Sequence, residues 1–168
     1  MGSCARGVTG SCGLEITGSC VGTAAATGMS NEDAALLADK MRYASIEAKE
    51  DFTFETVLSS HYKLDILEKA KAEGYFIKCI FVLTVDSSVN VARVAARVAH
   101  GGHHVDEDKI RSRYHKSLGN IKRLMELCDI LHVYDNTEEP VRIIRKHKAD
   151  ISIFPNELWT AERILELL

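Results

Sequence analysis

Glu55 and Thr56 are the first residues whose types and position could do chemistry. They end the run 52–56, whose aromatic and β-branched residues predict a short strand. Ligands of open parallel sheets bind at the carboxyl ends of the strands, so a carboxylate and a hydroxyl there can contact a polar substrate. A glutamate at a strand end is also commonly just hydrated, and the spacing alone favours neither interpretation.

Arginines form the second candidate group. Arg93, Arg97 and His100 follow the spacing i, i+4 and i+7, which places them on one face of a predicted helix. Arg111 and Arg113 begin the next predicted helix after a Gly-Gly turn. Two such helices resemble a lid over phosphates, because guanidinium groups stay charged, bind phosphate oxygens in pairs and neutralise charge during phosphoryl transfer. The spacing alone favours the simpler alternative, an ordinary solvated helix face.

Two other clusters give weaker signals. His100, His103 and His104 precede the acidic residues 106–108, which invites a metal-site interpretation. However, the adjacent His103 and His104 cannot easily share one metal, and acidic residues at a helix start are explained by the helix dipole. The basic residues 142–148 have no aromatic platform beside them in the sequence, so we expect a solvated edge there. We therefore expect neither a metal site nor a nucleic-acid-binding surface.

Alternating helices and strands must position these residues. Apolar spacing and capping residues predict helices over 31–49, 60–74, 88–100, 106–125 and 156–168. The nearly continuous apolar run 75–84 predicts a strand covered on both faces, and shorter strands are expected at 130–134, 141–144 and 151–154. Because the strands are separated by helices, the pattern predicts an α/β domain with a mostly parallel sheet.

The overall composition restricts the class of protein. With 168 residues, 46% of them hydrophobic, the chain suits one domain with a real core, which excludes two enzyme domains and a wholly disordered protein. Its formal net charge of -3 gives no reason to expect nucleic-acid or anionic-membrane binding. The sequence contains neither a membrane-spanning apolar run nor a secretory signal, so we expect a cytoplasmic protein.

Residues 1–28 differ in composition from the rest of the chain. They hold seven of the eleven glycines and three of the five cysteines, and their only apolar cluster is 14–16. Such a segment cannot bury enough apolar surface to offset the entropy lost by ordering glycine. Its three Gly-Ser-Cys repeats are eight residues apart, which does not match the spacing of zinc ligands. We therefore expect a flexible leader over 1–28, whereas Cys79 and Cys128 lie in apolar runs and are expected in the core.

The segment 52–136 resembles the zeta-toxin-like P-loop kinases, also described as predicted ABC-type ATPases. The matching motifs are FTFETVLSS, VARVAARVAHGGHHV, IRSRYHKSLGNI and the strand ending VYDNT, and a looser similarity covers 29–168. The resemblance implies a three-layer P-loop-kinase-like fold and the use of ATP and Mg²⁺. It also implies phosphoryl transfer to a hydroxyl of a sugar nucleotide, with an antitoxin protein as a partner.

The same resemblance implies roles for the candidate residues. Glu55 and Thr56 would bind the substrate at the strand edge. Arg97 and Arg113 would be the catalytic residues of the lid, and together with Arg93 they would bind the phosphates of the nucleotide. The resemblance assigns no residue of this chain to a metal.

One feature of the family is missing from the sequence. Members begin with a strand and a loop GxxxxGK[ST], which supplies backbone N–H groups, a lysine for the terminal phosphates and a hydroxyl for Mg²⁺. The sequence contains neither Gly-Lys-Ser nor Gly-Lys-Thr, its first lysine is Lys40, and the Asn-x-Asp segment with the family's general base is absent. We therefore expect 29–168 to be an incomplete kinase domain, without the N-terminal strand and phosphate loop and inactive by itself. The alternative is a non-catalytic remnant that serves as a binding or antitoxin-interacting module.

Overall fold

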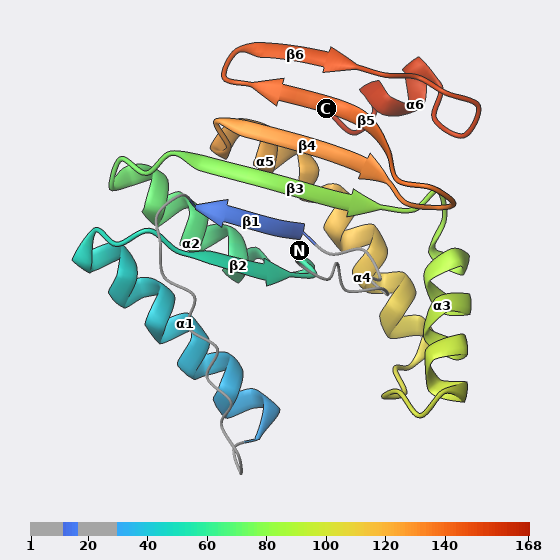
Figure 1. Cartoon of the computed structure of the whole chain (residues 1–168), viewed down its shortest axis with the longest axis horizontal. Coiled ribbons are helices and arrows are strands. Elements are labelled where there is room, and N and C mark those ends of the chain that lie inside the picture. Colours follow the sequence, from blue (N-terminus) through green and yellow to red (C-terminus); the bar gives the residue numbers. More distant parts are fainter. Residues whose placement is uncertain (1–11, 17–29) are drawn as a thin grey trace, which may run out of the picture.

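The computed structural model describes residues 12–16 and 30–168, which form one sheet in the order β2-β1-β3-β4-β5-β6 with helices around it (Figure 1). The strands are β1 (Cys12–Ile16), β2 (Thr53–Thr56), β3 (Ile77–Leu83), β4 (Ile130–Asp135), β5 (Val141–His147) and β6 (Asp150–Ile153). The helices are α1 (Asn31–Ala48), α2 (His61–Ala72), α3 (Ser87–Ala99), α4 (Glu107–Gly119), α5 (Ile121–Leu127) and α6 (Ala161–Leu165). The predicted α/β class is confirmed.

Side-chain caps explain where several helices begin. The Ser30 hydroxyl accepts a hydrogen bond from the Asp33 backbone N–H, so α1 starts at the predicted cap. Asp86 caps α3 in the same way through the backbone N–H of Ser88, and Asp106 caps α4. These local bonds satisfy N–H groups that have no partner inside the helix. They fix the first turns of α3 and α4, the two helices that form the site described below.

The pairing of the strands corrects the predicted parallel sheet. Only β3 and β4 pair in parallel, whereas β1 with β2, β1 with β3, β4 with β5, and β5 with β6 pair antiparallel within the described residues. Parallel neighbours need a crossover of about a dozen residues or more. The connections after β4 and β5 are far shorter, and Lys148 adopts a positive φ of 55° in the turn between β5 and β6. The C-terminal strands therefore form antiparallel hairpins.

Strand β1 lies inside the segment 1–28, for which the sequence predicts a flexible leader. Residues 12–16 lie between β2 and β3, where Leu14 is paired with Phe54 on one side and Cys79 on the other. This strand contains the apolar cluster 14–16. It supplies backbone hydrogen bonds to two strands that would otherwise expose unpaired N–H and C=O groups. The rest of the predicted leader lies outside the described residues.

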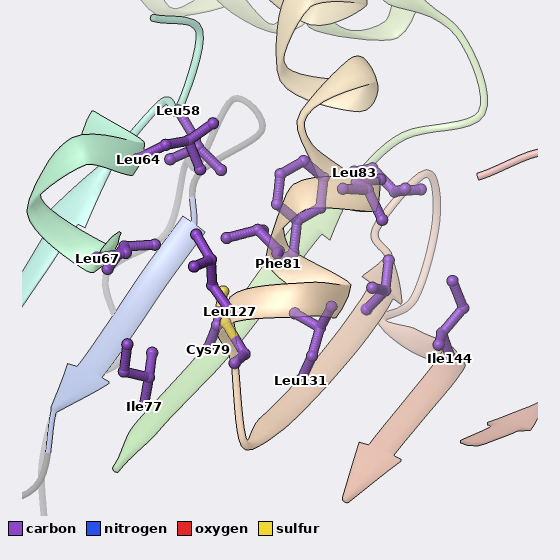
Figure 2. Packing of buried hydrophobic residues seen from close by; sticks show 14 of the residues in the cluster. Leu58, Leu64, Leu67, Ile77, Cys79, Phe81, Leu83, Leu127, Leu131 and Ile144 are labelled. Atoms are coloured by element: carbon purple, nitrogen blue, oxygen red, sulfur yellow. The ribbon is translucent and has the colours of Figure 1, made fainter. Parts of the chain in front are cut away.

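The core lies on one face of the sheet. Alternate residues of β3 are buried, namely Ile77, Cys79, Phe81 and Leu83, and they pack against buried residues of α2 and α5 (Figure 2). The intervening residues of β3 are half-buried. The prediction that both faces of this strand are covered therefore holds fully for one face and only in part for the other. Cys79 and Cys128 are both buried, as expected. Among the helices of the described residues, none is both long and apolar enough to cross a lipid bilayer.

The C-terminal segment contains less helix than predicted. The helix expected over 156–168 is confined to α6. Asn156 prevents an earlier start because its side-chain oxygen accepts from the backbone N–H groups of Leu158 (3.0 Å) and Trp159 (2.9 Å). Such an Asn turn competes with helix formation. It places Trp159, which is only 1% exposed, in the core.

Candidate functional site

Four strands of the described sheet, β2, β3, β4 and β6, point in the same direction. Because β1 runs antiparallel to both β2 and β3, and β3 is parallel to β4, the carboxyl ends of β2, β3 and β4 lie at one edge. Helix α3 begins just after β3, and α4 packs against α3 at this end of the molecule (Figure 1). The sheet edge expected to carry ligands is therefore the edge next to α3 and α4.

A pocket of about 250 Å³ opens between α3 and α4. Its apolar lining consists of Val57, Val94, Val105, Ile110 and the ring of Tyr114. Its polar lining consists of Asn90, Arg97, Arg113 and Ser117. The pocket thus combines an apolar interior with two guanidinium groups from different helices. Pockets that bind small molecules have this kind of composition, with few polar groups among apolar walls.

The turn after α3 positions Arg97. The Arg97 carbonyl accepts hydrogen bonds from the backbone N–H groups of His100 (3.1 Å) and Gly102 (2.9 Å), and its guanidinium donates to the His103 carbonyl at 3.4 Å. A Cβ atom on Gly102 would lie 2.5 Å from Arg97 Cγ and 2.7 Å from the Arg97 carbonyl oxygen. Gly101 has a φ of +84°, a region that favours glycine. The Gly-Gly turn is therefore required for the close approach that holds Arg97 at the pocket.

The arginines of this region differ in their partners. Arg97 and Arg113 form no ion pair with any carboxylate in the described residues. Arg111, in contrast, is 2.7 Å from a Glu107 carboxylate oxygen and donates to the Ser87 hydroxyl at 3.0 Å. Within the part of the chain that the structure describes, the two arginines that line the pocket therefore have no carboxylate partner, whereas Arg111 has one.

The other predicted site residues lie outside the pocket lining. Arg93 donates to the carbonyl oxygens of Asn136 (2.7 Å) and Thr137 (3.0 Å), so it ties α3 to the loop after β4. Glu55 is exposed on β2, and the Thr56 hydroxyl accepts from the backbone N–H of Leu58 at 3.2 Å. The structure thus places Arg97 and Arg113 in the lining of one pocket, which does not include Arg93, Glu55 or Thr56.

Asn90 is a pocket residue that the sequence analysis missed. It lies on the buried face of α3 with Ser87 and Val94, and it is 4% exposed. The sequence feature that could have indicated Asn90 is a polar residue on the apolar face of a helix, because buried polar side chains nearly always form hydrogen bonds. The arginine spacing alone did not reveal it, since the side chain lies on the apolar face.

Tyr114 forms part of the buried wall of the pocket. Its hydroxyl donates to the Thr84 carbonyl at 2.7 Å, and its backbone carbonyl accepts from the Ser117 hydroxyl at 2.8 Å. Burial, which disfavours the charged phenolate, raises the pKa of Tyr114 to about 12 from its ordinary value of 10.0. The hydroxyl therefore stays protonated at neutral pH and anchors α4 to the end of β3.

The raised pKa of Tyr114 predicts a pH dependence of stability. Between pH 10 and pH 12 the unfolded chain loses the phenol proton while the folded chain retains it, so the free energy of unfolding falls as the pH rises. Below pH 10 this contribution is fully present. We expect Tyr114→Phe to lose this part of the pH dependence and to cost about 1 kcal/mol at neutral pH, because the Thr84 carbonyl loses its donor. Urea unfolding of both proteins across this pH range measures both effects, and parallel curves would contradict the assignment.

The histidine cluster has no metal-binding geometry. Within the described residues, no group of three His, Cys, Asp or Glu side chains is placed to hold a metal ion. His100 Nδ1 lies 2.7 Å from the Ala96 carbonyl oxygen on its own helix, which gives this ring a local partner. The described site contains two guanidinium groups beside an apolar cavity, and groups of this kind can bind an anion.

Comparisons with known proteins give one family and one relative. The family model described as Zeta toxin matches residues 19–149. An uncharacterized protein of Haemophilus influenzae is 28% identical over 86 residues, which cover 51% of this chain and 61% of that protein. The aligned part thus spans somewhat less than two thirds of the relative's length. No solved structure matches the chain significantly.

Proposed function

The chain belongs to the zeta toxin family, and we propose that its pocket between α3 and α4 binds the phosphate groups of a nucleotide or another phosphorylated small molecule. The family suggests a P-loop-kinase-like function, which agrees with the resemblance found in the sequence motifs. The observation that carries the proposal is the position of Arg97 and Arg113, which line one pocket without an ion-pair partner in the described residues.

The charges of these two side chains favour an anion with more than one negative charge. Like charges that share a pocket repel each other, and a phosphate group between them replaces that repulsion by attraction. Guanidinium groups also bind phosphate oxygens in a bidentate geometry that an ammonium group cannot offer. The apolar walls exclude water from part of the pocket, which strengthens these interactions. Arg97 and Arg113 would thus hold a phosphate and neutralise charge on it.

The finer parts of the function are proposed from the family. They are the use of ATP and Mg²⁺ and the transfer of a phosphoryl group to a hydroxyl of a sugar nucleotide. The two arginines fit the phosphates of ATP. The sequence has no GxxxxGK[ST] loop, whose hydroxyl would contact Mg²⁺. We therefore propose that this chain binds phosphates but does not transfer them by itself.

A second candidate is a non-catalytic module that binds an antitoxin or another partner protein. The absence of Gly-Lys-Ser and Gly-Lys-Thr from the sequence favours it, because phosphoryl transfer depends on a positioned phosphate cradle and its lysine. The two candidates differ in whether the pocket itself takes a phosphate, and this difference can be measured.

Titration with ATP tests the proposal. Without a backbone cradle, we expect a dissociation constant on the order of 1 mM, which is about −4 kcal/mol of binding free energy. Isothermal titration of the chain with ATP, with and without Mg²⁺, measures the affinity, and a phosphate-release assay measures turnover, for which we expect none. Micromolar affinity with steady phosphate release would show that the chain is an active kinase or ATPase. Failure of ATP and of pyrophosphate to bind at all would contradict the phosphate site.

A further inference from the structure

We propose that Asn90 determines which ligands the pocket accepts, by taking a hydrogen bond from a hydroxyl or N–H group on the part of the ligand that lies against the apolar walls. The phosphate of the same ligand would be held by Arg97 and Arg113, so this inference rests on the proposed function of the pocket. The ligand class is a phosphorylated compact ring that carries a hydrogen-bond donor.

The first observation is an acceptor without a donor. Asn90 lines the pocket and is 4% exposed, and its side-chain oxygen is buried without a hydrogen-bond partner in the described residues. Asparagine in a helix usually bonds to nearby backbone, but this oxygen does not. A buried polar atom without a partner is unfavourable, and such exceptions in a folded protein need an explanation.

The second observation is that the nearby hydroxyls are already used. Two hydroxyl groups belong to the residues that line the pocket. The Tyr114 hydroxyl donates to the Thr84 carbonyl at 2.7 Å, and the Ser117 hydroxyl donates to the Tyr114 carbonyl at 2.8 Å. A hydroxyl has only one proton to donate, so neither can also serve Asn90. These two hydroxyls therefore do not supply the missing donor, and we assign it to a molecule that enters the pocket.

The size and lining of the pocket restrict that molecule. Its volume is about 250 Å³, and an apolar cavity of about 150 Å³ is known to hold benzene, so a substituted ring fits. Val57, Val94, Val105 and Ile110 favour an apolar ring face over a fully hydrated group. Inorganic phosphate alone would use the arginines and leave the Asn90 oxygen without a partner. A phosphorylated ring with one hydrogen-bond donor matches the two arginines, the apolar walls and the Asn90 oxygen together.

Phenyl phosphate and its three hydroxyphenyl phosphate isomers test the proposal. All four carry the same phosphate and the same ring, and the isomers add one O–H group at different positions. We expect the isomer whose hydroxyl reaches Asn90 to bind the full chain at least tenfold more tightly than phenyl phosphate. In Asn90→Leu, which keeps the branched shape of the side chain but removes the acceptor, we expect the ratio of the two affinities to fall to about one.

Two further variants make the result decisive. Asn90→Ala removes the acceptor without adding volume, so the ratio should fall in this variant even if Asn90→Leu disturbs the packing. Ser112→Ala, at an exposed position of α4 outside the pocket lining, should keep the ratio of the unchanged chain. We also expect Asn90→Leu to melt at the same temperature as the unchanged chain or higher, because it replaces an unpartnered buried amide by an apolar group.

The outcomes separate this inference from the proposed function. If phenyl phosphate and its hydroxyl isomers all bind with equal affinity, the phosphate site stands and the role of Asn90 is wrong. A preference that persists in both Asn90→Leu and Asn90→Ala likewise overturns it. If none of the four compounds binds, the phosphate site itself fails, and the inference fails with it.

Discussion

Replacing Arg97 or Arg113 by alanine is expected to abolish measurable phosphate binding while the fold survives. A hydrogen bond to a charged group contributes roughly 1.5–3 kcal/mol, and each 1.4 kcal/mol is a factor of ten in affinity. Because the dissociation constant of the unchanged chain is expected to be millimolar, removal of either guanidinium group raises it beyond the range in which pyrophosphate or ATP titrations saturate. Phosphorus NMR of pyrophosphate, which detects weak binding through line broadening, measures this loss directly.

The effect on turnover should be larger still in a protein that has a phosphate loop. In a hybrid that joins such a loop from an active family member to this chain, either substitution should lower turnover by about two orders of magnitude or more, because the arginines act on charge that develops in the transition state. Unchanged turnover in both variants would mean that Arg97 and Arg113 are ordinary surface residues without a role in catalysis.

Arg111→Ala is the matched control for both experiments. It removes the same charge from the same helix as Arg113→Ala, but Arg111 is paired with Glu107 and Ser87 and does not line the pocket. If binding depended only on the net charge of α4, Arg111→Ala and Arg113→Ala would weaken it equally. We expect only Arg113→Ala to weaken it strongly, and circular dichroism spectra of all three variants should match that of the unchanged chain.

Leu14→Pro is expected to lower the stability of the whole domain. Strand β1 has paired neighbours on both sides, so a proline at its centre removes a hydrogen bond of the ladder and introduces a steric clash. We expect a loss of about 2–3 kcal/mol in the free energy of unfolding, which for a chain of this size is roughly 4–12 °C in melting temperature. Thermal melts followed by circular dichroism measure the shift.

Leu14→Val serves as the control for this substitution. It keeps the backbone N–H and a residue type that favours strands, so it should melt close to the unchanged chain. Hydrogen exchange adds a local readout, because amides of β2 and β3 that pair with β1 should lose protection in Leu14→Pro. An unchanged melting temperature together with unchanged protection would mean that residues 12–16 are not part of the sheet, as the composition of 1–28 first indicated.

Local sequence signals located most helices and strands but did not give the direction of the strands. Ser30 marked the start of α1, and the apolar run 75–84 marked β3, because capping and burial depend on neighbouring residues. The direction of β5 and β6 was overlooked although the short connection between them excludes a parallel crossover. The pairing of β1 could not be predicted, since it depends on contacts with β2 and β3, which are distant in the sequence.

The sequence by itself determined the family, the α/β class and the two arginine-bearing helices, because these follow from motifs and periodicities along the chain. Only the tertiary structure decided which arginines share a pocket: Arg97 and Arg113 converge there, whereas Arg93 is bound to backbone carbonyls after β4. It also placed Asn90 in the lining of the same pocket, with a buried side-chain oxygen that has no donor among the described residues. The physical reason is that spacing assigns a side chain to a helix face, but its partners come from elements distant in sequence, whose positions depend on the packing of the whole core.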